Sequence, residues 1–303
     1  MMITHEPIHI KGNDEFAKKA KEEGWVGDGT KHNPYIIENL EINGETSAEC
    51  IRIQDTDVYF VIRNCCLWYA NINNIQTVGG GIFLRDVKNG RIINNICTRN
   101  NCDGIVLVAS TNNIIINNIC TVNRGDGICL YKSSNNNILT YNRCKNNNKD
   151  GISVHASSNN IVTYNTCTKN NRVGILMNSS LNNILNSNTS IENKSDGIHL
   201  SYSSNNTYTN NTCIRNGGNG ISINHSSSNI LSNEIFISNK KIDISTSDSS
   251  NDIIINILYS KGYFITRPCL HRRLIDIKMR YMYRHNSKQK RKRVRERLLC
   301  GNA

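Results

Sequence analysis

Glycine and isoleucine recur along this chain with an almost constant spacing. Seven Gly-Ile pairs begin at Gly81, Gly104, Gly127, Gly151, Gly174, Gly197 and Gly220. Successive pairs are 23 residues apart, except for one step of 24 that coincides with a Ser-Ser-Asn-Asn-Asn run at 133–137. A fixed period of this length is typical of a solenoid, because one repeat cannot bury its own apolar side and has to stack on its neighbours.

Within each repeat, apolar and polar residues alternate over short stretches. The isoleucine after each glycine is followed two positions later by another apolar side chain, as in Ile105 and Leu107. A period of two predicts a short strand with one buried side. A second apolar pair follows the Ser/Asn run, as in Ile114 and Ile116. A third strand carries a column of cysteines with one serine: Cys66, Cys97, Cys120, Cys144, Cys167, Ser190 and Cys213.

Asparagine separates the three strands. It tolerates left-handed backbone and bonds to its own turn, so it suits the corner of a coil, and stacked asparagines can form a ladder. Three columns have the repeat spacing: Asn113, Asn137, Asn160, Asn183, Asn206 and Asn229; Asn64, Asn95, Asn118, Asn142, Asn165, Asn188 and Asn211; and Asn100, Asn123, Asn147, Asn170, Asn193, Asn216 and Asn239. Three short strands and three corners predict a triangular coil. Because β-branched residues rather than leucines fill the repeat, an all-β parallel β-helix is favoured over a leucine-rich repeat.

The pattern divides the chain into three parts. Residues 1–49 are expected to form an N-terminal cap and the first strands. Residues 50–258 are expected to form the parallel β-helix, of about nine coils of 23 residues. Residues 259–303 form a basic tail that is expected to be helical or disordered.

The N-terminal end of the solenoid needs a cap, since it would otherwise expose apolar core and unpaired strand edges. Residues 13–23 predict a short amphipathic helix, with Asn13 or Asp14 as its N-cap and Gly24 after its end. Phe16 and Trp25 are expected to close the core.

The formal charge of +12 is concentrated in the tail. Residues 261–303 hold 14 Lys/Arg and 2 Asp/Glu, whereas the first 260 residues balance 22 basic against 22 acidic side chains. The neutral body does not suggest nucleic acid as a partner. The tail could bind nucleic acid or an anionic membrane, but an appended segment without a role in the repeats is the favoured interpretation.

The cysteines and the N-terminus bear on cofactors and compartment. None of the twelve cysteines forms a CxxC pair, which argues against structural zinc. Their stacked column favours buried thiols over disulfides, because parallel side chains suit the disulfide torsion poorly.

The opening MMITHEPIHI has no signal-peptide core, and no transmembrane run is present. A complete chain would therefore be cytoplasmic, and we expect a monomer.

Residues that alternate with the core columns of the first strand should point outward and form a laddered surface. Tyrosine can stack on a sugar ring, and Asn, His and Arg supply hydrogen bonds, so this surface suits an extended polar ligand such as a polysaccharide or a surface protein. The predicted ligand-contacting residues are Arg85, Tyr131, His155, Asn178, His199, Tyr202 and Asn224.

An acidic column precedes the glycines, with Asp103, Asp126, Asp150 and Asp196 as its members. The plain interpretation is turn chemistry, because Asp-Gly is a turn signal and a carboxylate can cap backbone amides. Like charges one coil apart repel, so the column could also recruit a cation such as Ca²⁺ or become partly protonated.

Two kinds of chemistry are conceivable on this surface. Asp150, His155, Asp196 and His199 are candidate catalytic residues, since proton abstraction from a sugar acid needs a base and an acid near one ring. His155, His199 and His225 are candidate copper ligands. Ordinary surface polarity explains both sets more simply, because no local motif fixes their geometry.

Two groups of residues carry a family resemblance. The stretches 24–30 (GWVGDGT), 33–37 (NPYII) and 58–65 (VYFVIRNC) resemble archaeal right-handed β-helix proteins of the NosD type. The later units, of the form N-N-x-D-G-I-x-L-x-x-S-S-x-N-x-I, are similar to repeats of the carbohydrate-binding and sugar-hydrolase β-helix superfamily. The resemblance covers about residues 3–258. It implies a right-handed, single-stranded parallel β-helix that is extracellular or at the cell surface.

The resemblance also implies candidate functions. The superfamily contains polysaccharide lyases, epimerases and hydrolases, and NosD proteins are periplasmic factors linked to copper-site maturation of nitrous oxide reductase. The Asp-Pro-His-Glu motif of mannuronan epimerases is absent, and residues 4–7 (Thr-His-Glu-Pro) are the nearest string. The Asn-Thr-Asp and Gly-His-Gly strings of polygalacturonases are absent too. No catalytic residue carries over, so we predict a non-catalytic module that binds glycan or protein, with a sugar-acting enzyme and copper delivery as alternatives.

Overall fold

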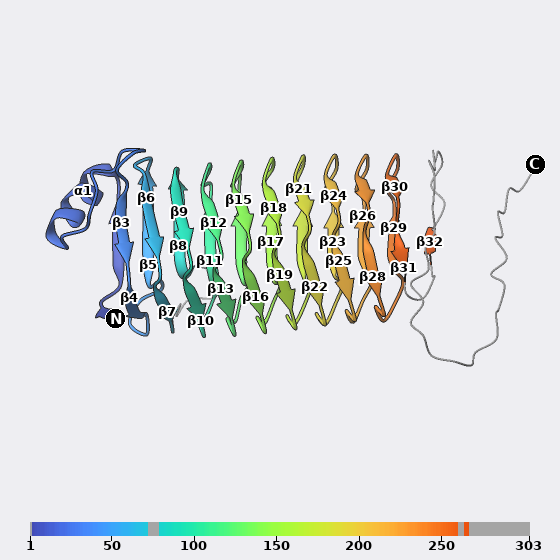
Figure 1. The fold of residues 1–303 in the computed structure, drawn as a ribbon, viewed down its shortest axis with the longest axis horizontal. Helices are drawn as coiled ribbons and strands as arrows, with labels where there is room; N and C mark the ends of the chain where they lie inside the picture. Colours follow the sequence, from blue (N-terminus) through green and yellow to red (C-terminus); the bar gives the residue numbers. More distant parts are fainter. Residues whose placement is uncertain (1, 72–78, 260–263, 267–303) are drawn as a thin grey trace, which may run out of the picture.

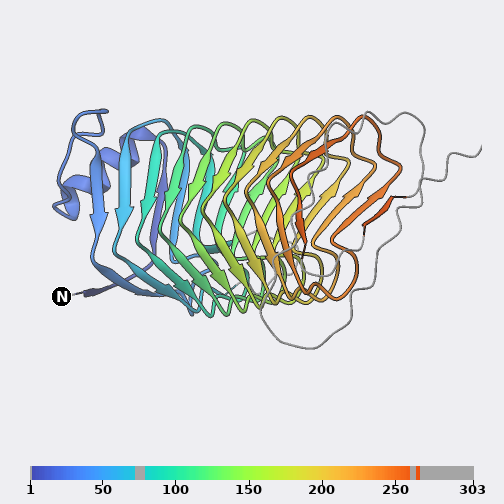
Figure 2. The same cartoon turned by 45° about the vertical axis from the view of Figure 1, so that its right-hand side comes forward.

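The computed structural model describes residues 2–71, 79–259 and 264–266, and in this part of the chain the backbone winds through three parallel sheets. Strands of successive coils stand side by side along the long axis (Figure 1). Figure 2 shows the chain passing from sheet to sheet in successive laps. The all-β solenoid of about nine repeating coils is therefore confirmed.

Each sheet takes one strand from every coil. Sheet A contains β1 (Ile3–His5), β4 (Leu40–Asn43), β7 (Cys66–Trp68), β10 (Ile96–Thr98), β13 (Ile119–Thr121), β16 (Arg143–Lys145), β19 (Thr166–Thr168), β22 (Thr189–Ile191), β25 (Thr212–Ile214), β28 (Ile235–Ile237) and β31 (Leu258–Tyr259). Sheet B contains β2 (Ile8–Lys11), β5 (Ile51–Thr56), β8 (Gly80–Val87), β11 (Asp103–Val108), β14 (Ile128–Tyr131), β17 (Ile152–His155), β20 (Ile175–Asn178), β23 (Ile198–Ser201), β26 (Ile221–Asn224), β29 (Ile244–Ser247) and β32 (Phe264–Thr266). Sheet C contains β3 (Tyr35–Glu38), β6 (Phe60–Arg63), β9 (Gly90–Ile93), β12 (Ile114–Ile116), β15 (Ile138–Thr140), β18 (Ile161–Thr163), β21 (Ile184–Asn186), β24 (Thr207–Thr209), β27 (Ile230–Ser232) and β30 (Ile253–Ile255).

Equivalent residues of successive coils lie directly opposite one another. Ile105 pairs with Ile128, and Ile128 pairs with Ile152. All three are fully buried in one continuous core. The extra residue of the 24-residue step lies at a corner, where Lys132 and Ser133 both have a positive φ. The strands on either side therefore keep their register.

The sheet C strands differ from the predicted pattern. The sequence pointed to Ile114 and Ile116 as a buried pair, but the structure buries Ile115 between them and leaves both partly exposed. In a three-residue strand only the middle side chain points inward. Because residues 114–116 are all isoleucine, the sequence does not show which of them points inward.

The asparagine columns form hydrogen-bonded ladders along the solenoid. In one rung, Asn142 Oδ1 accepts both the backbone N–H and the side-chain Nδ2 of Asn118, each at 3.0 Å. Asn142 Nδ2 in turn donates to the carbonyl oxygen of Ile115 at 2.8 Å. Each side chain thus satisfies buried backbone groups at a corner that has no strand partner.

Two of the residues that the sequence assigned to columns, Asn64 and Cys66, do not stand in those columns. Cys65, not Asn64, stands at the ladder position, since its backbone N–H donates to Asn95 Oδ1 at 2.9 Å. Leu67, not Cys66, pairs with Cys97 and fills the cysteine column. Asn64 instead occupies the left-handed position before the ladder, with a φ of 54°.

The other cysteines of the column are free thiols, as predicted. Cys97, Cys120, Cys144, Cys167 and Cys213 are all buried. Burial raises the pKa of Cys120 and Cys167 well above the usual value. These two thiols are therefore neutral packing material for the core.

The helical cap forms at the N-terminal end of the solenoid (Figure 1). Helix α1 spans Asn13–Glu22, but its N-cap is Gly12, so the prediction of Asn13 or Asp14 was wrong. Asn13 Oδ1 instead accepts the hydroxyl of Thr56 at 2.6 Å. The predicted closure is confirmed for Phe16, which is fully buried, while Trp25 packs partly buried against the same core.

At the C-terminal end, β32 pairs with β29, so three residues of the predicted tail extend sheet B. Tyr259, the first residue of the predicted tail, lies in β31 of sheet A. The remaining tail residues, 260–263 and 267–303, lie outside the described residues. Within the described residues, no helix is long and apolar enough to span a membrane.

Two of the three ladders end in an acid instead of an amide. The first ends at Asp252, whose Oδ1 accepts the N–H and Nδ2 of Asn229, and the second ends at Glu234. Glu234 follows Asn211 in the second column and is fully buried, and its Oε1 accepts Asn211 Nδ2 at 3.1 Å. Its Oε2 and the buried hydroxyl of Tyr208 have no hydrogen-bond partner in the described part of the chain. Burial raises the pKa of Glu234 from its usual 4.5 to about 8.

Replacing Glu234 with asparagine is therefore expected to stabilise the protein at neutral pH, by about 3 kcal/mol for a shift of this size. Because the folded state holds the proton more tightly, the contribution of Glu234 to stability is greatest below pH 4.5 and is lost as pH rises towards about 8. The melting temperatures of both proteins should converge near about pH 4 and differ most above about pH 8. A difference that is independent of pH would contradict this explanation.

Candidate functional site

The outward side of sheet B, which we call the outer face, carries two files of side chains. The near file, closer to the glycines, contains Phe83, Val106, Cys129, Ser153, Leu176, His199 and Ser222. The far file contains Arg85, Val108, Tyr131, His155, Asn178, Ser201 and Asn224. All seven predicted ligand-contacting residues, including Tyr202 at the corner beyond the far file, are partly or fully exposed.

Aromatic rings add flat surfaces to this face. Tyr202 is 59% exposed, and its ring stacks on His225 with centroids 4.8 Å apart. Tyr131 meets His155 edge to face at 6.3 Å, and the Lys132 ammonium lies 5.2 Å from the Tyr131 ring centroid. Exposed rings of this kind can pack against a sugar ring while their polar edges form hydrogen bonds.

The N-terminal half of the near file is closed to ligands. Phe83 and Val106 are fully buried and Cys129 is 7% exposed, although the alternation placed all three on the outward side. They form a small separate apolar cluster. The guanidinium groups of Arg52 and Arg85 lie 5.0 and 5.3 Å from the centroid of the Phe83 ring. Ser153, Leu176 and Ser222 of the near file are buried as well, so the available surface is the far file together with His199.

The acidic column holds the backbone of the next coil. Asp126 Oδ1 accepts the N–H of Asp150 at 2.8 Å, and Asp150 Oδ1 accepts the N–H of Val173 at 2.8 Å. Asp196 Oδ1 does the same for Asn219 at 2.6 Å. In these contacts the carboxylates cap backbone amides, which is the simpler of the two roles that the sequence suggested for the acidic column.

The structure joins two of the four candidate catalytic residues. Asp196 Oδ2 lies 2.9 Å from His199 Nδ1. Asp150 is buried, lies 3.9 Å from the Arg172 guanidinium, and has a pKa raised to about 6 by burial and by Asp126. Burial lowers the pKa of His155, which keeps its ring neutral. The four residues therefore do not form one constellation.

The three candidate copper ligands also have separate surroundings. His155 packs on Tyr131, His199 bonds to Asp196, and His225 stacks on Tyr202. Among the described residues, no group of three metal-ligating side chains includes a histidine.

One other group could hold a metal ion. Ligand atoms of Asp103, Asp126 and Cys129 lie within 4.8 Å of one another. Burial and the neighbouring Asp126 raise the pKa of Asp103 to about 7. However, Asp103 Oδ1 accepts the N–H of Asp126 at 2.6 Å, and Asp126 Oδ2 accepts the hydroxyl of Ser153 at 2.6 Å. Hydrogen bonds and partial protonation thus account for this group without an ion.

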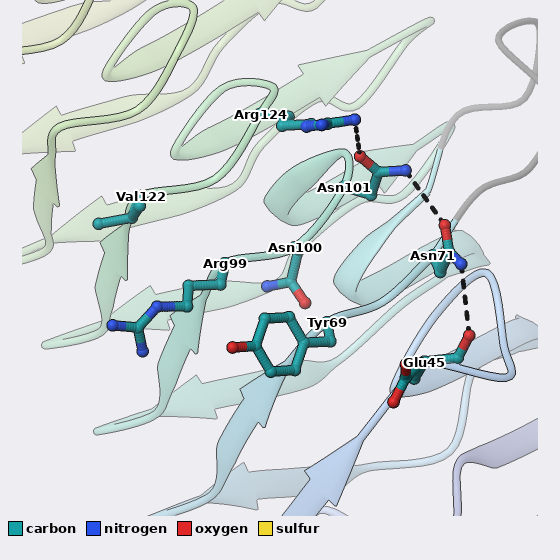
Figure 3. A pocket seen from close by; sticks show the side chains of 8 residues that line it. All are labelled: Glu45, Tyr69, Asn71, Arg99, Asn100, Asn101, Val122 and Arg124. Atoms are coloured by element: carbon teal, nitrogen blue, oxygen red, sulfur yellow. Dashed lines mark hydrogen bonds between the residues drawn. The ribbon is translucent and has the colours of Figure 1, made fainter.

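A pocket of about 630 Å³, which we call the corner pocket, lies where the sheet A strands turn towards sheet B. Its lining residues follow β4, β7, β10 and β13: Glu45, Tyr69, Asn71, Arg99, Asn100, Asn101, Val122 and Arg124 (Figure 3). The outward residues of the first strand gave no sign of this pocket, because it lies at a different corner of the coil. The signal in the sequence was Val122, two positions after the cysteine column, because no other described coil has a β-branched residue at this corner position.

A family model and several solved structures are similar to this chain in fold. The family model described as "Right handed beta helix region" matches residues 25–148 and 132–258. No curated protein matches the chain.

Solved structures share the fold at low identity. The enzymatically active domain of tailspike protein 2 from bacteriophage CBA120 has a TM-score of 0.62 at 11% identity, over 84% of this chain and 42% of that one. The A-module of the mannuronan C-5 epimerase AlgE6 from Azotobacter vinelandii has a TM-score of 0.58 at 14% identity, over 75% and 65%. A double mutant of the periplasmic alginate epimerase AlgG has a TM-score of 0.53 at 15% identity, over 91% and 85%. At such identities the likeness extends to the fold alone.

The expected right-handed coil is thus confirmed, whereas the NosD subclass stays a prediction. With the family model covering most of the solenoid, the chain belongs to the right-handed β-helix family.

Proposed function

We propose that the protein binds an extended polysaccharide along the outer face of sheet B and performs no chemistry on it. The observation that carries this proposal is the exposed strip formed by the far file and the stacked pair Tyr202–His225. Five consecutive coils contribute one polar or aromatic side chain each, from Tyr131 to Asn224. At about 4.8 Å per coil, the strip is about 20 Å long.

The acidic groups support binding rather than catalysis. Asp150 and Asp196 each hold a backbone N–H of the next coil, so their carboxylates already have a structural role. The solved structures with the same fold include two alginate-type epimerases, which makes acidic polysaccharides reasonable first ligands to test. An extracellular or cell-surface location, as the family resemblance implies, is part of this proposal.

The proposal is tested by removing both rings of the stacked pair. Tyr202→Ala/His225→Ala should weaken binding on a polysaccharide array by about tenfold or more, because ring stacking is a main source of contact area. Tyr141→Ala/Tyr164→Ala is a matched control, since these exposed rings also stack, at 5.0 Å, but at a different corner. Equal affinities for the two variants would exclude the outer face as the binding surface.

The alternative function is a polysaccharide epimerase, lyase or hydrolase. The observation that favours it is the Asp196–His199 pair, whose 2.9 Å contact resembles a base and its orienting carboxylate. Incubation with alginate and pectate, followed by proton NMR of the products, should show no change if the binding proposal is right. Turnover that disappears in His199→Gln would establish the enzyme instead.

A further inference from the structure

The corner pocket combines features that the outer face lacks, and its size lies within the range of about 300–1,000 Å³ usual for small-ligand sites. Within the described part of the chain, neither of its cations has an acidic partner. The Arg99 side chain forms no hydrogen bond or ion pair there, and only the Arg99 backbone N–H is bonded, to the carbonyl oxygen of Thr121 at 3.3 Å. Among the described residues, the Arg124 side chain bonds only to a neutral amide, through Nη1 to Asn101 Oδ1 at 2.6 Å.

The same corner shows the opposite arrangement several coils later. There Glu192 lies 2.7 Å from Arg215 and 3.6 Å from Lys169, so each cation has a carboxylate partner. Arg99 and Arg215 both occupy the left-handed corner position, with φ values of 54° and 49°. The corner position that Arg99 shares with Arg215 therefore does not explain why the Arg99 side chain has no acidic partner among the described residues. Glu45 is the single acid among the described residues that line the pocket, so these residues carry a net positive charge.

Apolar surface lies beside these cations. Tyr69 is 47% exposed and Val122 is 48% exposed. Val122 also has a φ of 59°, and no other described valine, isoleucine or threonine has a positive φ. A β-branched side chain is unfavourable in this conformation, and such strain is commonly kept where a side chain serves a binding site.

Polar groups form the opposite wall. Asn101 Nδ2 donates to Asn71 Oδ1 at 3.1 Å, and Asn71 Nδ2 donates to the carbonyl oxygen of Glu45 at 3.4 Å (Figure 3). With the Arg124–Asn101 bond, this row connects four successive coils. In the view of Figure 3, the Tyr69 ring lies between the side chains of Arg99 and Glu45.

From this arrangement we propose that the corner pocket binds one unit of an acidic saccharide, independently of the outer face. The Arg99 guanidinium binds the carboxylate or sulfate group of the sugar, since its planar fork matches an oxyanion. The Tyr69 ring and the Val122 methyl groups contact the apolar side of the pyranose ring. Glu45 and the Asn71–Asn101 row bond to the hydroxyl groups.

Calorimetric titration of the full chain with three short probes tests the proposal: tri-galacturonic acid, a sulfated tetrasaccharide and neutral maltotriose. At least one acidic probe should bind, with an affinity that falls as salt is added, and maltotriose should not. Arg99→Gln and Tyr69→Ala should each weaken that binding by about tenfold or more. Arg215→Gln, which alters the ion-paired arginine of the same corner, should change it by less than about twofold.

Three results would overturn the proposal: no binding of either acidic probe, equal binding of maltotriose, or the same affinity for Arg99→Gln and Arg215→Gln. Comparison of the two acidic probes decides between carboxylate and sulfate as the recognised group. Because Tyr202→Ala/His225→Ala should leave this binding unchanged, failure at the outer face and failure at the corner pocket can be told apart. Unchanged circular dichroism spectra would confirm that each variant is folded.

Discussion

Replacing Asn165 with alanine should destabilise the solenoid by about 4 kcal/mol, because one side chain serves two adjacent coils. Its Oδ1 accepts the backbone N–H and Nδ2 of Asn142, at 2.9 and 3.0 Å. Its Nδ2 donates to the carbonyl oxygen of Leu139 at 2.9 Å and to Asn188 Oδ1 at 3.0 Å. Alanine would leave the Asn142 N–H and the Leu139 carbonyl oxygen buried without partners, which costs more than losing an exposed hydrogen bond.

Denaturant or thermal unfolding of the full chain measures this effect. Asn171→Ala is the matched control, since Asn171 is exposed and its amide bonds only to the exposed side chain of Asn148. The control should change stability by less than about 0.5 kcal/mol. If Asn165→Ala is no more destabilising than Asn171→Ala, the ladder does not stabilise the coils as proposed.

Replacing Gly151 with alanine should be at least as harmful, although it adds only one methyl group. The new Cβ would lie 2.6 Å from the carbonyl oxygen of Gly174 and 2.7 Å from both Cβ and Sγ of Cys167. The Gly174 oxygen belongs to the backbone, and the Cys167 Cβ is bonded directly to it. Rotation of the Cys167 side chain therefore cannot relieve the overlap. Overpacking of this kind costs about 1–3 kcal/mol in an ordinary core, and more where the backbone has to move.

The measurement is the yield of soluble protein together with its melting temperature. Ser201→Ala is a suitable control, because Ser201 lies on the outward side of the same sheet and is partly exposed. Wild-type stability of Gly151→Ala would show that the coils can move apart locally. In that case, contact with the cysteine column would not explain why glycine recurs at this position.

The repeat could be predicted from the sequence because every coil meets the same steric demands. Glycine at the close approach to the cysteine column, isoleucine in the core and asparagine at the corners recur for reasons that act within one coil and its neighbours. Seven repetitions of one pattern made the period and the stacking unambiguous. The helical cap was also visible, since its apolar residues had no place in a coil.

Register in the first coils could not be predicted in the same way. The string Arg-Asn-Cys-Cys-Leu at 63–67 allows two alignments that differ by one residue, and both place a cysteine or an asparagine in a column. A shift of one residue exchanges the inward and outward sides of a strand. The structure chooses the alignment that buries Leu67, which gains more from burial than Cys66 would.

The sequence predicted which residues point outward from sheet B, but it did not predict which of them are exposed. Alternation placed Phe83, Val106, Cys129, Ser153 and His199 on the outward side, whereas the structure buries all of them except His199. Burial on the outward side depends on groups that lie over the sheet, such as Arg52 and Arg85, and a period of two carries no information about them. The corner pocket escaped prediction for a related reason, because four turns of different coils have to meet before it exists.

The stacking register has a consequence for how such a protein can change in length. Each coil bonds only to the coil before it and the coil after it, as the pairing of Ile152 with Ile128 and Ile175 illustrates. Duplication of one 23-residue unit would therefore insert a complete layer with all its partners supplied, and would lengthen the outer face by about 4.8 Å. Gene duplication could thus adjust the reach of this surface in uniform steps while the terminal regions stayed unaltered.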